Sequence, residues 1–267
     1  MISIDALLGS FAAGYSTQSS LASYKKVEAR TDYYKGVFDK QPDAKRELVY
    51  FKEKFPKVSS VDALLKDRRL TQFVLGAVGL EGAIDQKAII KKALTEDPAA
   101  NTSLVNRLAD PRWAQFAKAM SFLNTQPSKA KDTAVQNTLI EGWRTNSFEK
   151  WQGETSGSAV REALYFKRNI GSVTTMWQAI ANPTIAKVLR VGLGQPEAFA
   201  ALDADKQYAR LSKAIKLTDF QDPKKVDRFL QRFLVNNDRA AAGTAADPAV
   251  TMMQGIADNM RGLNILV

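Results

Sequence analysis

Apolar residues recur along this chain at intervals of three and four, the spacing that places side chains on one face of an α-helix. Runs of alternating apolar and polar residues, which mark half-buried strands, are scarce. The pattern predicts an all-α protein of roughly ten to twelve helices with short connections. The clearest stripes are Leu48, Phe51 and Phe55; Leu70, Phe73, Val74, Ala77 and Val78; Ile185, Val188, Leu189 and Leu193; and Val226, Phe229, Leu230, Phe233 and Leu234.

Helix boundary signals agree with these stripes. Asp110-Pro111, Asn182-Pro183 and Asp222-Pro223 each place a good capping residue before a proline, and each pair precedes an amphipathic run. Gly79 and Gly194 follow the second and third stripes, where a left-handed residue ends a helix. We therefore expect helices to begin and end at these positions.

The chain contains an internal repeat. Glu47-Leu-Val-Tyr-Phe-Lys52 returns as Glu162-Ala-Leu-Tyr-Phe-Lys167, 115 positions later. The same offset holds without a gap from Tyr33/Phe148 to Gly79/Gly194. With an offset of 121, Val105–Leu108 then matches Val226–Phe229. This register predicts two copies of one helical unit of about 100 residues.

The repeat divides the chain into four parts. We expect an N-terminal helical segment over 1–29, repeat units over 30–140 and 141–237, and a linker with an apolar tail over 238–267. The linker is predicted because residues 238–249 have almost no large apolar side chain. The tail either packs back on the body or docks on a partner. Its helical stripe, a candidate partner-binding segment, comprises Met252, Met253, Ile256, Met260 and Leu263.

The amino-acid composition excludes several kinds of structural and catalytic site. The chain has no cysteine and no histidine, which excludes disulfides, classical structural zinc sites, and Ser-His-Asp or Cys-His catalysis. The net charge is +10, but no run of five basic residues occurs, so solvated helix faces are expected and nucleic acid is not the favoured partner. The densest basic groups are Lys66, Arg68 and Arg69; Lys91 and Lys92; and Lys224, Lys225, Arg228 and Arg232.

No motif completes a catalytic, cofactor or metal site. Ser-x-x-Lys at Ser23–Lys26 and Ser147–Lys150 occurs about as often as chance predicts. The glycines at 76, 79, 192 and 194 fit helix ends better than phosphate loops, which need a preceding strand. Asp203-x-Asp205 lacks the rest of a calcium loop and is interpreted as a helix cap. We expect no catalytic residue, no cofactor and no metal ligand.

Aromatic residues are expected mainly in the core. The Tyr50-Phe51 and Tyr165-Phe166 pairs recur on an apolar stripe. Trp143 and Trp151 are eight residues apart and can share one helix face, where exposure would indicate an interface.

Sequence features bearing on location are few. The start of the chain lacks a basic region before its apolar residues, so no cleavable signal peptide is expected. No apolar stretch approaches the ~20 residues of a transmembrane helix. The expected location is the cytoplasm, and export by a route without a signal stays open.

Two segments carry a family resemblance: Phe73–Leu80 and Leu104–Trp113. They resemble an uncharacterised bacterial family with an Ala-Phe-Gly-Leu-like helix end and an Asn-x-Leu-x-Asp-x-Arg-aromatic stretch. Val78 departs from the aromatic of the first pattern. The second is matched by Asn106, Leu108, Asp110, Arg112 and Trp113.

The resemblance implies an all-helical protein of a family often encoded among flagellar genes, with no established activity and no site residues to carry over. Flagellar proteins are the implied partners, and export through the flagellar apparatus is an implied alternative to the cytoplasm. The leading hypothesis is a non-enzymatic flagellum-associated structural, assembly or adaptor protein. A basic helical regulator that binds nucleic acid and a carboxylate-based enzyme remain alternatives, and the oligomeric state stays open.

Overall fold

A computed structural model describes residues 19–244. Within this range the chain forms α- and 3-10 helices and no strand, so the predicted all-α class is confirmed. Eleven α-helices of the described range have nine residues or more, in line with the ten to twelve predicted. In the same range, no helix combines the length and the apolarity that crossing a membrane requires.

The first half of the described chain contains most of the short helices. Its elements are α2 (Ser20–Ala29), α3 (Thr31–Asp39), α4 (Pro42–Lys54), η1 (Phe55–Lys57), α5 (Val61–Lys66), α6 (Arg68–Gly76), η2 (Glu81–Ala83), α7 (Lys87–Thr95), α8 (Leu104–Arg107), α9 (Arg112–Met120), α10 (Phe122–Thr125) and η3 (Pro127–Lys131).

The second half begins with the longest helix. Its elements are α11 (Thr133–Ser156), α12 (Ser158–Asn169), η4 (Ile170–Ser172), α13 (Met176–Ala181), α14 (Pro183–Gly192), η5 (Glu197–Ala201), α15 (Ala204–Ala214), η6 (Leu217–Gln221) and α16 (Pro223–Thr244).

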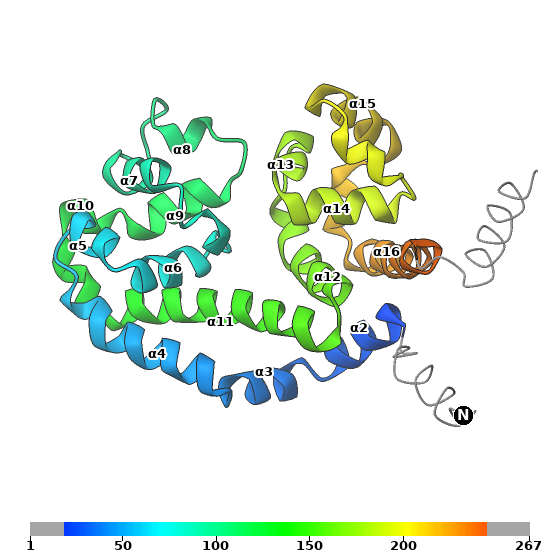
Figure 1. Cartoon of the computed structure of the whole chain (residues 1–267). Coiled ribbons are helices and arrows are strands. Elements are labelled where there is room, and N and C mark those ends of the chain that lie inside the picture. Colours follow the sequence, from blue (N-terminus) through cyan, green and yellow to red (C-terminus); the bar gives the residue numbers. More distant parts are fainter. Residues whose placement is uncertain (1–18, 245–267) are drawn as a thin grey trace, which may run out of the picture.

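Helix α11 is the central element of the molecule (Figure 1). It packs against α3 and α6 from the first half and against α12 from the second. Helices α5 to α10 gather over its N-terminal end, and α12 to α16 lie beyond its C-terminal end. The predicted unit boundary at residues 140 and 141 therefore falls inside a helix that contacts both halves.

The predicted helix ends are present. Asn182 caps α14 by accepting from the Ile185 N–H, with Pro183 as the first helical residue. Asp110 and Asp222 each accept from the N–H two residues ahead, at the starts of α9 and α16. Gly79 and Gly194 have φ angles of 74° and 69°, the left-handed conformation that favours glycine.

The apolar stripes face the core as predicted. Phe51 and Phe55 of the first stripe, and Leu230 and Phe233 of the fourth, are fully buried. Phe166 of the recurring Tyr-Phe pair is fully buried as well. Burying such side chains stabilises the fold by about 1.5–3 kcal/mol each before conformational entropy is subtracted.

Contacts recur at the predicted offset of 115. The Tyr50 hydroxyl donates to Asp67 Oδ2 at 2.7 Å, and the Asn182 amide donates to the Tyr165 hydroxyl at 2.8 Å. Helices α5 and α13 begin and end at equivalent positions, and so do η1 and η4. The internal duplication stays a prediction, and these recurring bonds support it.

Beyond α6 and α14, the structure gives no support to the predicted offset of 121. Residues 105–107 lie in the four-residue helix α8, whereas residues 226–229 lie inside the 22-residue helix α16. At an offset of 90, the bounds of η3 recur as those of η6, and the first residue of α11 recurs as that of α16. Asn146 donates to the Gly76 carbonyl at 3.0 Å, and Asn236 donates to the Val191 carbonyl at 2.9 Å.

The predicted linker is wrong for residues 238–244, because α16 continues to Thr244. The run is rich in alanine, the residue with the highest helix propensity. Asp238 also anchors α2, since it accepts from the backbone N–H of Ser20 at 2.9 Å and from its hydroxyl. Residues 1–18 of the predicted N-terminal segment lie outside the described residues.

Candidate interaction groove

A groove of about 370 Å³ opens between α3, α4, α6 and α11. Its floor is aromatic, with Phe38 from α3, Phe73 from α6, and Trp143 and Trp151 from α11. Its rim is polar and carries four acidic and two basic side chains: Asp43, Glu47, Glu81, Glu154, Arg69 and Lys150.

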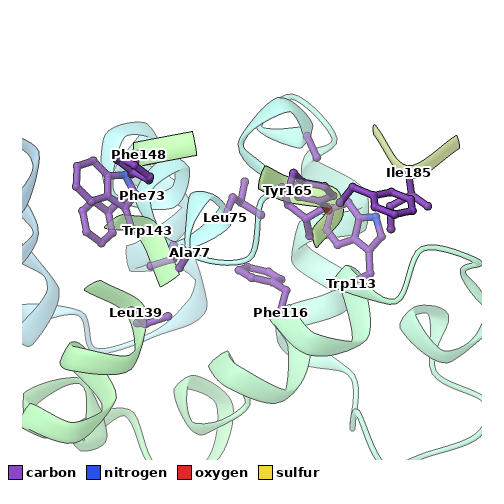
Figure 2. Packing of buried hydrophobic residues seen from close by; sticks show 14 of the residues in the cluster. Phe73, Leu75, Ala77, Trp113, Phe116, Leu139, Trp143, Phe148, Tyr165 and Ile185 are labelled. Carbon is purple, nitrogen blue, oxygen red and sulfur yellow. The ribbon is translucent and has the colours of Figure 1, made fainter. Parts of the chain in front are cut away.

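The groove floor is the end of a column of stacked rings. Phe55 stacks on Phe51 at a centroid distance of 4.6 Å, and Phe51 stacks on Phe73 at 4.2 Å. Phe73 in turn stacks on Trp143 at 4.7 Å with an interplanar angle of 10°, an arrangement visible in Figure 2. The floor is thus held rigidly by the core beneath it.

A second aromatic cluster lies beside this column. The ring centroid of Phe38 lies 6.2 Å from that of Trp143 and 6.0 Å from that of Trp151. It lies 6.2 Å from the ring centroid of Phe148. The two tryptophans, eight residues apart, therefore share one face of α11 as predicted. Trp151 is only half-buried, so its indole is the accessible part of this cluster.

Two glycines let α11 approach α6 closely. A Cβ on Gly76 would lie 3.2 Å from Trp143 Cδ1, so the indole lies directly over α6. A Cβ on Gly142 would lie 2.3 Å from the Ala77 carbonyl oxygen, well inside van der Waals contact. The spacing of the two helices, and with it the position of the groove floor, depends on these missing side chains.

Several rim charges are paired with neighbouring side chains. Glu47 binds Arg69, whose Nε donates to both carboxylate oxygens at 3.2 Å and whose guanidinium lies 4.0 Å from the Tyr50 ring centroid. Asp43 pairs with Arg46 one turn along α4. Lys150 and Glu154 make no ion pair within the described residues and are exposed at the rim.

A partly buried ion pair joins α11 to α12. Arg168 binds Glu149 through Nε at 2.7 Å and Nη2 at 2.9 Å. Burial raises the pKa of the Glu149 carboxyl, and the hydrogen bond from Arg168 opposes that rise. Arg168 Nη2 also donates to Asn146 Oδ1 at 2.7 Å, which orients the Asn146 amide toward the end of α6.

Residues of the family-like stretch hold the turns around α9. Asp110 binds the Arg112 guanidinium at 2.7 Å, and Arg112 Nη1 donates to the Gly79 carbonyl at 2.5 Å. Asn106 donates to the carbonyls of Pro98 and Ala100, both at 2.9 Å. Trp113 is buried beside Phe116. These side chains connect helix ends to one another and do not line the groove.

The other sequence candidates are separated in space. Ser147 and Lys150 line the groove, whereas Ser23 and Lys26 lie at a second cavity near the start of α2. Asp203 lies at the start of α15 as predicted, but its carboxylate binds Lys206 instead of the helix N–H groups. No group of three acidic residues between 19 and 244 is arranged to hold a metal ion.

The predicted partner-binding tail with Met252, Met253, Ile256, Met260 and Leu263 lies outside the described residues. Sequence reasoning missed Phe38, Gly76 and Asn146 as parts of the groove. The useful signal was the spacing of Trp143 and Trp151, because two tryptophans on one face of a helix need partners on another element.

Comparison with known families matches residues 77–226, more than half of the chain, to the family described as protein of unknown function DUF1217. The chain belongs to the DUF1217 family. The DUF1217 match runs from the end of α6 to the start of α16 and so includes α11, with Trp143 and Trp151.

A solved structure resembles this DUF1217 protein along most of its length. The X-ray crystal structure of an Agrobacterium tumefaciens protein from a structural genomics programme is 32% identical and aligns with a TM-score of 0.71. The alignment covers 83% of this chain and 94% of the Agrobacterium protein. No curated protein matches the chain.

Proposed function

We propose that this DUF1217 protein is a non-enzymatic structural, assembly or adaptor protein of the flagellum that acts through protein–protein contacts. The observation that carries the proposal is the aromatic floor of the groove between α3, α4, α6 and α11. A rigid, partly exposed tryptophan surrounded by a polar rim, as Trp151 is here, is characteristic of the central residues of protein interfaces.

The state of Glu149 and Glu47 supports a binding role over catalysis. An acid–base enzyme needs a carboxylate with a shifted pKa that is free to reach a substrate. The pKa of Glu149 is raised, but both of its oxygens are bound by Arg168 and it does not line the groove. At the rim, both oxygens of Glu47 accept from Nε of Arg69.

The flagellar setting is inferred from the family that the sequence resembles, because members of that family are often encoded among flagellar genes. The fold fits an adaptor because α11 joins the two halves and bears the accessible Trp151. A partner bound at this groove would contact α3, α4, α6 and α11 together.

A genetic complementation experiment tests the proposal. Deleting the gene in its own bacterium is expected to reduce the number of flagellar filaments and the swimming rate, and the wild-type gene restores both. Trp151→Glu is expected to fail to restore them, because loss of a central interface tryptophan weakens binding by about 2 kcal/mol, roughly 30-fold. Filaments are counted by electron microscopy and swimming is measured by tracking.

Trp177→Glu is the matched control. Trp177 is 41% exposed and stacks on Tyr208 at 4.6 Å, away from the groove. It should complement normally, and both variants must retain the wild-type circular dichroism spectrum. Normal filaments and swimming in the deletion strain would contradict a flagellar role, and full activity of Trp151→Glu would contradict the role of the groove.

A further inference from the structure

Another groove, of about 370 Å³, lies between the Ile215-Lys216 connection, η6 and α16. Its apolar part consists of Ile215, Phe220 and Phe229. Phe220 is buried, whereas Ile215 and Phe229 are half-buried, so the groove offers a small apolar surface at the protein exterior.

The rings in this groove are fixed by one another. Phe229 contacts Phe220 edge-on at 5.1 Å and stacks on Phe166 at 5.7 Å. Gly192 makes room for Phe229, because a Cβ there would lie 2.6 Å from the ring. The groove is therefore a rigid surface whose shape does not depend on a ligand.

Positive charge surrounds the apolar part. Four exposed basic side chains line the groove together with one carboxylate, Asp219, which is bound by Lys225. Lys216 and Arg228 make no ion pair with any residue between 19 and 244. The basic residues are Lys216, Lys225, Arg228 and Arg232.

Their arrangement on α16 is regular. One face of the helix carries four of the lining residues, because they are separated by three, one and three positions. These residues are Lys225, Arg228, Phe229 and Arg232. Arg232 is oriented by a 2.6 Å hydrogen bond from its Nε to the Gly192 carbonyl. Three of the four basic residues in the group Lys224, Lys225, Arg228 and Arg232 therefore line one apolar groove.

Only Ile215 and Lys216 separate α15 from η6, and the groove opens at this junction.

We propose that this groove binds an acidic amphipathic helical segment of a partner protein. An apolar side chain of that segment enters between Ile215 and Phe229, and its flanking carboxylates meet the positive charge around them. Carboxylates on its flanks pair with Lys216 and Arg228. This inference rests on the proposed adaptor function and adds the chemical class of a second partner.

The geometry favours a peptide over nucleic acid. A single strand needs exposed ring faces for base stacking, as well as positive charge. Here Phe220 is only 5% exposed, and Phe229 lies stacked on Phe166. The groove therefore has positive charge and an apolar floor without a free aromatic platform.

Fluorescence anisotropy with purified full-length protein tests the proposal. The probe is a labelled synthetic helical peptide with leucine and phenylalanine on one face and glutamates on the other. We expect saturable binding that Arg228→Glu weakens by about tenfold or more, because a carboxylate then faces the carboxylates of the peptide. Arg210→Glu, the same charge change on α15 outside the groove, should change the affinity less than about twofold.

Two further probes complete the test. Replacing the leucine and phenylalanine of the peptide by alanine should abolish binding, and a single-stranded oligothymidylate should not compete. Equal loss in both protein variants, equal binding of the alanine peptide, or competition by the oligonucleotide would overturn the proposal. Because the measurement uses purified protein, its failure would leave the complementation result for Trp151 unaffected.

Discussion

Replacing Gly142 by alanine is expected to lower the free energy of unfolding by about 2 kcal/mol or more. The added methyl group would lie 2.3 Å from the Ala77 carbonyl oxygen and 3.1 Å from its carbon. These atoms belong to the backbone at the end of α6, so only a shift of the whole helix relieves the clash. Urea unfolding followed by tryptophan fluorescence measures the loss.

Gly36→Ala is the matched control, because Gly36 lies within α3 and a methyl group added there would meet no neighbouring atom within 4 Å. At this position the higher helix propensity of alanine should raise the free energy of unfolding by about 0.5–1 kcal/mol. Opposite signs for the two variants are therefore expected. Equal effects would show that α11 does not cross α6 at the distance described.

Replacing Arg168 by methionine is expected to lower the free energy of unfolding by about 3 kcal/mol at neutral pH. The Glu149 side chain is 6% exposed, so removing Arg168 leaves a buried carboxylate without the counter-charge that is hydrogen-bonded to it. Asn146 loses a hydrogen bond at the same time. Replacing both Glu149 and Arg168 by methionine should return the free energy of unfolding to within about 1 kcal/mol of wild type.

The loss of stability in Arg168→Met should become smaller as the pH is lowered. The folded-state pKa of Glu149 is raised above its ordinary value of 4.5, so the folded protein binds more protons than the unfolded protein around that pH. The contribution of Glu149 to stability therefore falls as the pH rises through its raised pKa. The loss in Arg168→Met should shrink on acidification toward pH 4.5, and a loss independent of pH would contradict an uncompensated carboxylate.

Local sequence signals predicted the helix ends well. Asn182-Pro183 and Gly194 mark the ends of one helix because the cap, the proline and the left-handed glycine each act within a few residues. The linker prediction at residue 238 was wrong since it relied on the lack of large apolar residues. Alanine can continue a helix without them, as α16 does to Thr244.

The groove could be predicted only in part, since it depends on contacts distant in sequence. The spacing of Trp143 and Trp151 indicated a shared face, but Phe38 and Phe73 join them only through the crossing of α3, α6 and α11. Likewise, the basic residues of α16 looked like a solvated face. Their position around Phe229 became visible only with η6 in place.

The most direct test of the adaptor function is photo-crosslinking in flagellated cells. A photoreactive amino acid replaces Lys150, an exposed residue at the groove rim, and in a second strain Lys118, an exposed residue of α9 away from the groove. We predict that position 150 forms a crosslink to one flagellar protein, that position 118 does not, and that Trp151→Glu abolishes the crosslink. The same products from both positions, or no flagellar protein at position 150, would contradict the account.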